Sequence, residues 1–453
     1  MKKGSPAQIS LFSSAFSILQ RNVFVYVLSI LTGVVVARTL GPEILGVWVL
    51  LTIVSSYAEG FGRLKTDLAS VYIFGSEKAK PEEILFSVTF FAIITSFIIV
   101  FILFWQLEFI ENLLFQNTEL DYREELVCII FLIPFEFLLL NYSYFYITLE
   151  NIVLFNRIKS LQAVINFGVL VFLIVAMDFK LWAIVLAKIL SVTTTLVYAW
   201  LSSDRKDWVK LGSRWNKSIT LKILRYAFNF YLIGIIGHIH RLTIKTIAAL
   251  SFNTSQLAFF SQGEAGSKLL NAVPESLGEI LYPRISKLES KEEAIQVSCT
   301  SFRVTLLILT FSGLLLALIA KPLIIFLYGA EFEPTAYVLR LAIPGVIIGS
   351  SCLTLAAFFQ GRGEANIIPK LQITPVLLQI VFAYLFINWW GLRGAAIAFS
   401  LGFSLYGLVI LFAFMWKNKV SILIMIPRVR DIKLIYSLII NIIKKKSSVT
   451  NEE

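Results

Sequence analysis

Long runs of apolar residues recur along almost the whole chain and constrain its fold more than any other feature. A helix that crosses a bilayer needs about 20 predominantly apolar residues. Only 15% of the 453 residues are charged, and 57% are hydrophobic. A soluble domain of this composition would expose large apolar patches to water, and a disordered chain would hold far fewer aromatic and branched residues. The sequence therefore predicts an all-α, polytopic membrane protein.

Eleven apolar runs reach bilayer length, at 23–38, 44–62, 84–105, 126–147, 161–177, 181–201, 226–250, 297–320, 337–360, 367–388 and 394–416. A twelfth segment, 256–283, is apolar on most sides although it contains Glu264, Lys268, Glu275 and Glu279. We include it because the connection would otherwise be too long for a loop, and because these polar residues share one helical face. The prediction is about 12 transmembrane helices.

The distribution of Lys and Arg predicts which ends of the helices face the cytoplasm. With the N-terminus inside and the spans alternating, the inside segments hold 29 Lys and Arg and the outside segments hold 5. Because basic residues favour the cytoplasmic side, both termini are predicted to be cytoplasmic. The same bias accounts for the net charge of +11, so we expect no nucleic-acid partner.

The most basic internal connection, 202–225, divides the spans six and six. Weak matches at a shift of 210–211 residues agree with two related six-helix bundles around a central cavity. The predicted domains are an N-terminal bundle at 1–222, a C-terminal bundle at 223–416 and a basic cytoplasmic tail at 417–453. Within that tail, the apolar stretch 432–443 is too short to span and is followed by lysines, which predicts an interfacial amphipathic helix.

Short motifs at three places resemble a known transporter family. They are Ala37–Gly46 (ARTLGPEILG), Lys321–Phe332 (KPLIIFLYGAEF), and Gln360–Gly363 (QGRG) with Gly391–Ala396 (GLRGAA). In order and spacing they resemble the polysaccharide flippases, the O-antigen (Wzx-type) group of the multidrug/oligosaccharidyl-lipid/polysaccharide (MOP) exporter superfamily. We interpret the motifs as architectural, because glycine and proline make tight turns and small residues let helices pack closely.

The resemblance implies a flippase of the cytoplasmic (inner) membrane. Such a protein translocates polyprenyl-pyrophosphate-linked oligosaccharide repeat units for O-antigen, capsule or exopolysaccharide synthesis by alternating access. The implied partners are the lipid-linked oligosaccharide, the bilayer and a polysaccharide polymerase, with H+ or Na+ as a coupling ion. Many relatives carry an Asp before the Arg of the seventh span. Here that pair reads His240-Arg241, so the role of that Asp is not transferred to this chain.

Ionisable residues inside the predicted spans are the candidate site residues, because each charge at a bilayer centre costs about 2.5–3.5 kcal/mol on insertion scales unless it is sheltered from lipid. Cations and amides could bind pyrophosphate or acidic sugars: Arg241, Lys245, Lys268, Lys188, His238 and Asn271. Carboxylates could couple transport to an ion: Glu264, Glu275, Glu279 and Glu59. The alternative is that these groups form internal ion pairs, such as the i,i+4 pair Glu264–Lys268.

Two other functions remain open on the sequence. One is a cation-coupled multidrug exporter of the same superfamily. The other is an integral-membrane glycan polymerase or glycosyltransferase, which would need sizeable outer loops with catalytic groups; the longest outer loop here has about 20 residues. We therefore expect no enzyme activity, catalytic residue or cofactor. Three cysteines and two histidines show no ligand spacing, so no metal site is expected.

Overall fold

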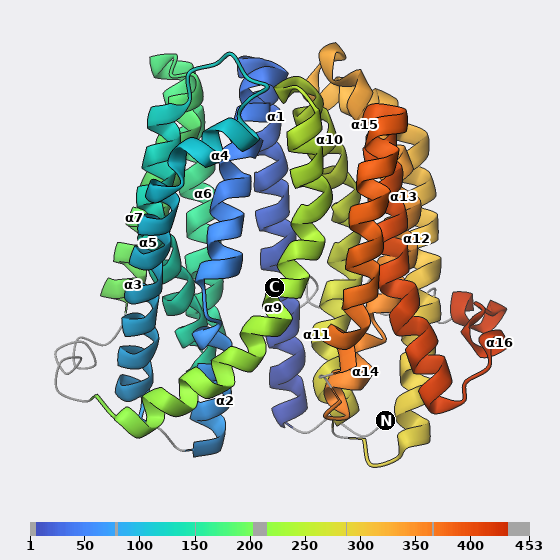
Figure 1. The fold of residues 1–453 in the computed structure, drawn as a ribbon. Helices are drawn as coiled ribbons and strands as arrows, with labels where there is room; N and C mark the ends of the chain where they lie inside the picture. The colour runs from blue at the N-terminus through green and yellow to red at the C-terminus, as the bar shows by residue number, and fades with distance from the viewer. Residues whose placement is uncertain are drawn as a thin grey trace, which may run out of the picture. The chain divides into compact units, whose positions relative to one another are not determined.

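The computed structural model describes residues 6–77, 80–149, 151–202, 215–286, 288–364 and 367–433, and these ranges are almost entirely helical (Figure 1). Their α-helices are α1 (Pro6–Gly62), α2 (Thr66–Glu77), α3 (Pro81–Trp105), α4 (Leu107–Leu114), α5 (Arg123–Thr148), α6 (Ile152–Met177), α7 (Leu181–Leu201), α9 (Lys217–Ser251), α10 (Thr254–Lys268), α11 (Ala272–Ser286), α12 (Lys291–Tyr328), α13 (Glu333–Leu353), α14 (Ala356–Gly361), α15 (Ile367–Asn418) and α16 (Ile422–Met425). Two 3-10 turns, η2 (Leu269–Asn271) and η3 (Ala330–Phe332), join α10 to α11 and α12 to α13.

Within the part of the chain that the structure describes, eight helical segments are long and apolar enough to span a membrane. The described residues contain no β-strand, so the predicted all-α polytopic fold is confirmed. Helices α1 and α15 each contain two of the predicted spans, while α9 and the pair α10–α11 correspond to the more polar seventh and eighth spans. The count of about 12 spans stays a prediction. Most of the predicted interfacial helix at 432–443 lies outside the described residues.

Glycines in left-handed conformations divide the two longest helices at the positions where the sequence predicts turns. Gly41 has φ 81° inside α1, and Gly391 has φ 54° inside α15. Other residues are strained at such angles, whereas glycine adopts them freely. Pro42, which has no amide hydrogen, directly follows the first break. The tight turn predicted at Gly41 and Pro42 is therefore present, and Gly391 breaks α15 within a motif for which close helix packing was predicted.

The chain forms two compact units. Unit 1 comprises 1–262, 324–335 and 383–395, and unit 2 comprises 263–323, 336–382 and 396–453. The domain boundaries predicted from the sequence stay a prediction.

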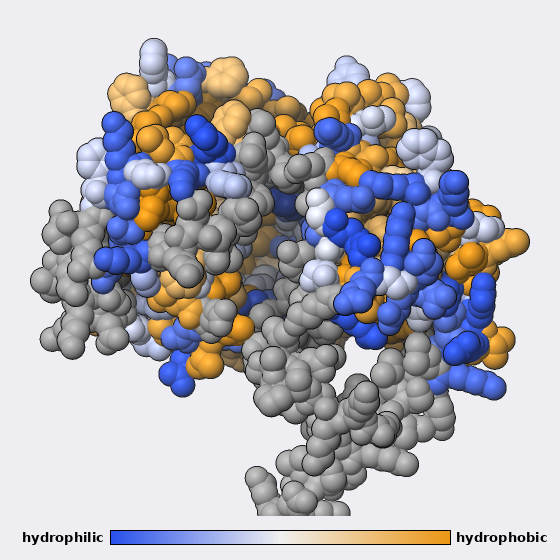
Figure 2. All heavy atoms as spheres, turned by 90° about the horizontal axis from the view of Figure 1, so that it is seen from below, coloured by the Kyte–Doolittle hydropathy of each residue, from blue (hydrophilic) through white to orange (hydrophobic). Residues whose placement is uncertain are grey.

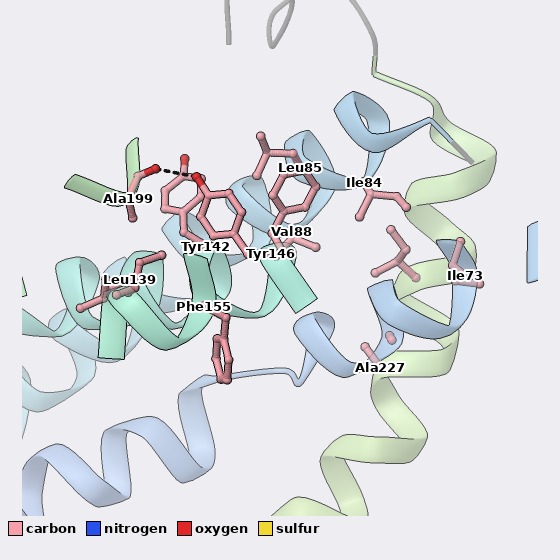
Figure 3. Close-up of a cluster of buried hydrophobic side chains, with 14 of the residues drawn as sticks. Ile73, Ile84, Leu85, Val88, Leu139, Tyr142, Tyr146, Phe155, Ala199 and Ala227 are labelled. Atoms are coloured by element: carbon pink, nitrogen blue, oxygen red, sulfur yellow. Dashed lines mark hydrogen bonds between the residues drawn. The ribbon is translucent and has the colours of Figure 1, made fainter. Parts of the chain in front are cut away.

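Unit 1 has an apolar core made by helices from several parts of its sequence (Figure 3). Ile73 of α2, Ile84 of α3 and Phe155 of α6 are all buried in it. Tyr146 of α5 brings a hydroxyl into this core, and that hydroxyl donates a 2.6 Å hydrogen bond to the carbonyl of Ala199 near the end of α7. A buried hydroxyl without a partner is costly, so this bond fixes where α5 meets α7.

Small residues bring two helices of unit 2 into close contact. Gly345 and Gly349 lie one turn apart on α13, and a side chain at either would collide with Ser400 or Phe403 of α15. The amide of Gly345 also donates a 2.8 Å hydrogen bond to the Ser400 hydroxyl. Two small residues spaced by four are typical of closely packed membrane helices. This pair is a packing signal that the sequence contains in addition to the three family-like motifs.

Two of the three family-like motifs meet within unit 1. Arg38, from the first motif, donates hydrogen bonds to the carbonyls of Phe326 and Leu327, at 2.7 Å for the Leu327 bond. These are among the last four carbonyls of α12, which have no partner within the helix. Gly46 of the first motif lies against the backbone of Thr254, where no larger side chain would fit. The architectural interpretation of the motif is consistent with these contacts.

Replacement of Arg38 should therefore weaken the fold more than it changes any binding step. We expect Arg38→Ala to destabilise the protein by about 0.5–1.5 kcal/mol, because two terminal carbonyls at an exposed position exchange a charged donor for water. Arg38→Lys should recover part of that loss. Thermal unfolding of the purified protein in detergent measures both effects. Unchanged unfolding of Arg38→Ala would show that the two motifs do not stabilise each other.

The exposed residues allow a sharp test of the predicted topology. Figure 2 views the molecule from below and shows many hydrophilic side chains at that end, with hydrophobic ones among them.

In a protein whose Cys128, Cys299 and Cys352 are replaced by serine, we expect Glu119→Cys and Glu331→Cys to react with an impermeant thiol reagent in intact cells. Glu289→Cys should react only after the cells are opened. All three positions are exposed in the structure. Labelling of position 289 from outside would show that 256–283 does not cross the membrane.

Candidate functional site

A polar cavity of ≈ 310 Å³ lies inside unit 1, where α1, α5, α6 and α7 meet. Its wall carries two carboxylates, two ammonium groups, an amide and hydroxyls, contributed chiefly by Glu59, Glu136, Lys159, Lys188, Gln162 and Ser55. Four helices thus place polar side chains around one cavity that is partly open. Glu59 and Lys188 are sequence-predicted site residues, and the structure brings them to the same cavity.

Lys188 is paired in this cavity. Its Nζ atom lies 2.8 Å from Oε1 of Glu136, and the Ser55 hydroxyl donates a 3.1 Å hydrogen bond to the other oxygen of that carboxylate. The same Nζ lies 5.6 Å from the centre of the Trp48 ring, a cation–π distance. The amine of Lys188 is therefore held by a carboxylate and an aromatic face, as the internal ion-pair alternative predicts.

Glu59 belongs to a second charged group at the end of α1. Arg63 donates to Glu59 at 3.1 Å and also to Asp67 at the start of α2. The Arg63 and Asp67 side chains are almost fully buried, whereas Glu59 is 38% exposed. The Arg63 guanidinium also lies 5.3 Å from the centre of the Tyr144 ring. One guanidinium is shared by two carboxylates, and Lys65 acts electrostatically on Glu59 from the same side, so the charges of this group are balanced within it.

Lys159 is a cavity cation that was not among the sequence-predicted site residues, and neither were Glu136, Gln162 and Ser55. It lies on the cavity wall, and among the described residues no carboxylate is within ion-pair distance of its amine. Glu59, Arg63 and Arg21 act on it electrostatically from farther away. Hydropathy begins this span at 161, which places Lys159 in a cytoplasmic segment. Its i,i+3 spacing from Gln162 is the signal that could have found it, because residues so spaced share a helical face.

His238 is buried where α9 crosses the end of α1. Its Nε2 atom lies 3.5 Å from Nζ of Lys65. A side chain at Gly60 would meet the His238 ring, and one at Gly234 would meet the aliphatic part of Lys65. The two glycines thus let the helices approach closely around this pair. These contacts describe His238 as a packed residue whose ring lies against Gly60 and Lys65.

The two predicted cations on α9 have different surroundings. Arg241 is exposed, and its charge acts on His238. Lys245 is half-buried, one turn further along the helix. Both residues belong to unit 1, as does the cavity, but neither lies on the cavity wall. The structure therefore does not bring Arg241 or Lys245 together with Lys188.

The predicted residues of the eighth span lie in unit 2. Lys268 donates a 2.6 Å hydrogen bond to the buried carboxylate of Glu264, so the i,i+4 pair is present, and its amine lies 5.6 Å from the centre of the Phe399 ring. Asn271 accepts a hydrogen bond from Ser350. The exposed Glu275 shares with Asn271 the wall of a separate cavity of ≈ 470 Å³. The side chain of Glu279 lies outside the described part of the structure.

The turn η2 interrupts the polar stripe expected on this span. The stripe assumed one continuous α-helix, but α10 ends at Lys268 and α11 begins at Ala272. A 3-10 turn advances about 120° per residue against about 100° in an α-helix, so three residues rotate the face by about 60°. Glu264 accordingly is buried, whereas Glu275 is exposed. Sequence spacing alone cannot reveal such a turn.

The fold and its buried polar groups define a multi-pass membrane protein with the architecture of the MOP-superfamily transporters. The chain belongs to the family described as polysaccharide biosynthesis protein, whose model matches residues 35–337. That family is the one the sequence motifs resemble. Comparison with curated protein sequences gives no match.

Solved structures show the same fold at low sequence identity. The lipid II flippase MurJ in an inward closed conformation has a TM-score of 0.72 at 15% identity, with 87% of this chain and 86% of that chain covered. A mutant of the Vibrio cholerae MATE transporter VcmN has a TM-score of 0.65 at 13% identity, with 91% and 97% covered. A MOP-superfamily transporter from Pyrococcus furiosus has a TM-score of 0.62 at 16% identity, with 92% and 98% covered.

The pairing of Glu136 with Lys188 can be tested by a double-mutant cycle. Glu136→Gln leaves the ammonium group without its carboxylate, so we expect destabilisation on the order of 1–3 kcal/mol. Lys188→Met should cost a similar amount, and the double variant should recover much of the loss. Thermal unfolding in detergent and abundance in the membrane provide the two readouts. If the stability loss of the double variant equals the sum of the losses of the two single variants, Glu136 and Lys188 do not interact.

Proposed function

We propose that this protein is a flippase that moves polyprenyl-pyrophosphate-linked oligosaccharide repeat units across the cytoplasmic membrane for the synthesis of O-antigen, capsule or exopolysaccharide. Membership of the polysaccharide biosynthesis protein family is the observation that carries the proposal. The substrate's pyrophosphate and glycan cannot cross hydrocarbon unaided, and a protein that moves them must offer polar groups inside the membrane. The unit 1 cavity provides such groups.

The chemistry of the cavity suits both parts of this substrate. The ammonium group of Lys159 can donate to phosphate or to an acidic sugar. The amide of Gln162 and the hydroxyl of Ser55 can exchange hydrogen bonds with glycan hydroxyls, and the carboxylate of Glu59 can accept from them. A site that contains both signs of charge and neutral polar groups fits a charged sugar carrier better than a purely apolar solute.

The remaining predicted residues keep their proposed roles. In substrate binding, Arg241, Lys245, Lys268, His238 and Asn271 add donors outside the cavity. In coupling, Glu59, Glu264, Glu275 and Glu279 are carboxylates that could take up H+ or bind Na+ as their exposure changes. The protein would act without catalysis of its own, and contact with a polysaccharide polymerase would hand on the translocated unit.

A cation-coupled multidrug exporter is the second candidate. Its support is the fold shared with MATE transporters and the group at the end of α1, in which one guanidinium is shared by two carboxylates. A cation substrate would pair with the carboxylate of Glu59, the more exposed of the two. The two candidates make opposite predictions for Lys159, because an ammonium group in the cavity attracts an anionic substrate and repels a cationic one.

Deletion and complementation in the native host distinguish the candidates. Deletion should cause a lipid-linked glycan to accumulate on the cytoplasmic leaflet. Complementation with Lys159→Met should restore less than about one tenth of the export, because a charged hydrogen bond to phosphate contributes about 1.5–3 kcal/mol. Arg157→Met is the matched control, since Arg157 is exposed two residues away on the same helix. Membrane abundance is measured for each variant.

The flippase proposal fails if the deletion strain accumulates no lipid-linked glycan but becomes sensitive to cationic drugs. The role of Lys159 fails separately if export by Lys159→Met equals that of Arg157→Met at equal abundance.

A further inference from the structure

A cavity of ≈ 560 Å³ in unit 2 lies where the N-terminal part of α12 meets the segment that follows α15. Its wall includes three arginines, Arg303, Arg428 and Arg430, against one acidic residue, Asp431. Apolar side chains, among them Ile295 and Ile424, complete the wall. The site thus combines an excess of positive charge with apolar surface. None of these residues belongs to the sites described above.

A buried ion pair fixes the shape of this cavity. Arg303 donates to both oxygens of Asp431, at 2.8 and 3.1 Å, and to the carbonyl of Ile424 at 2.8 Å. The backbone amide of Arg428 donates a further 2.8 Å hydrogen bond to Asp431. Arg303 and Asp431 are 8% and 3% exposed. This ion pair between Arg303 and Asp431, here called the clamp, holds the segment after α15 against α12. It therefore determines where Arg428 and Arg430 lie.

The clamp is complete at neutral pH. The hydrogen bond from Arg303 lowers the pKa of the Asp431 carboxyl below its usual range. The pKa of this carboxyl is lower in the folded protein than in the unfolded chain, where it is about 3.9. Its contribution to the stability of the fold is therefore fully present above pH about 3.9. That contribution is lost as the pH falls through the pKa of the folded state. The carboxylate therefore neutralises one guanidinium at physiological pH. The other two guanidinium groups keep their charge.

Arg428 and Arg430 are exposed beside a row of exposed apolar residues. Among the described residues, neither guanidinium has a carboxylate within ion-pair distance, and Asp431 is paired with Arg303. The neighbouring side chains that are more than half exposed are Ile422, Leu423, Ile426, Val429 and Ile432. Apolar residues next to arginines are typical of a segment that lies in a membrane interface.

We propose that this cavity binds the phosphate of an anionic phospholipid headgroup, with Arg428 and Arg430 as its donors. Phosphate is the group that guanidinium recognises best, because two parallel N–H donors match its oxygens. A lipid rather than a free phosphate is favoured because the exposed apolar residues of the tail need acyl chains around them. The tail is then held to the bilayer by one bound lipid as well as by general surface attraction.

Lipid binding by the purified full-length protein tests this site. Delipidated protein in a neutral detergent is titrated with phosphatidylglycerol or phosphatidylcholine, and bound lipids are counted by native mass spectrometry. The double variant Arg428→Gln/Arg430→Gln should bind phosphatidylglycerol about 30-fold more weakly, because each arginine near an anionic lipid contributes roughly a factor of five. The control, Arg157→Gln/Lys217→Gln, removes two exposed charges elsewhere and should change binding less than twofold.

Glycerol 3-phosphate serves as the soluble competitor. The proposal predicts that it does not displace phosphatidylglycerol at millimolar concentration. Displacement would show a free-phosphate site and overturn the lipid assignment. Equal binding of the two lipids, or equal losses in the variant and the control, would show that attraction is diffuse and that the cavity selects no headgroup.

Discussion

The need to shelter ionisable side chains from hydrocarbon organises the helices of this protein. A charge at a bilayer centre costs about 2.5–3.5 kcal/mol, and pairing it inside a bundle avoids much of that cost. Glu136 and Lys188 therefore join α5 to α7, and Arg63 joins the end of α1 to α2. The opposite faces of the helices are free to carry large apolar residues, and Phe101, Phe311 and Leu318 are exposed as lipid-facing residues should be.

The fold could be predicted well because its two strongest signals are local. Apolar runs of bilayer length mark the spans, and Gly41 and Gly391 mark the breaks between consecutive helices. The contacts that unite the family-like motifs could not be predicted, because Arg38 and Leu327 are distant in sequence. The turn η2 could not be predicted either, since its hydrogen bonds differ from those of an α-helix by only one residue.

The candidate site was predicted less completely, for a physical reason. Sequence spacing places Glu59 and Lys188 on inward faces, but it cannot tell a paired charge from one that lacks a partner. The structure pairs Lys188 with Glu136. Among the described residues, Lys159 is the cation on the cavity wall that has no carboxylate within ion-pair distance. Lys159 was missed because hydropathy shortens a span at its first charged residue, whereas α6 continues back to Ile152. Charged residues in the first turns of a span are therefore worth examining before a loop is assigned.

Translocation in a reconstituted system is the most direct test of the account. Purified protein is placed in vesicles that contain a fluorescent polyprenyl-pyrophosphate oligosaccharide in both leaflets, and dithionite is added outside. The account predicts that label from the inner leaflet becomes quenched over time in vesicles with the unmodified protein, and that Lys159→Met slows this phase. A rate equal to that of protein-free vesicles would contradict the central claim that this protein carries lipid-linked glycans across the membrane.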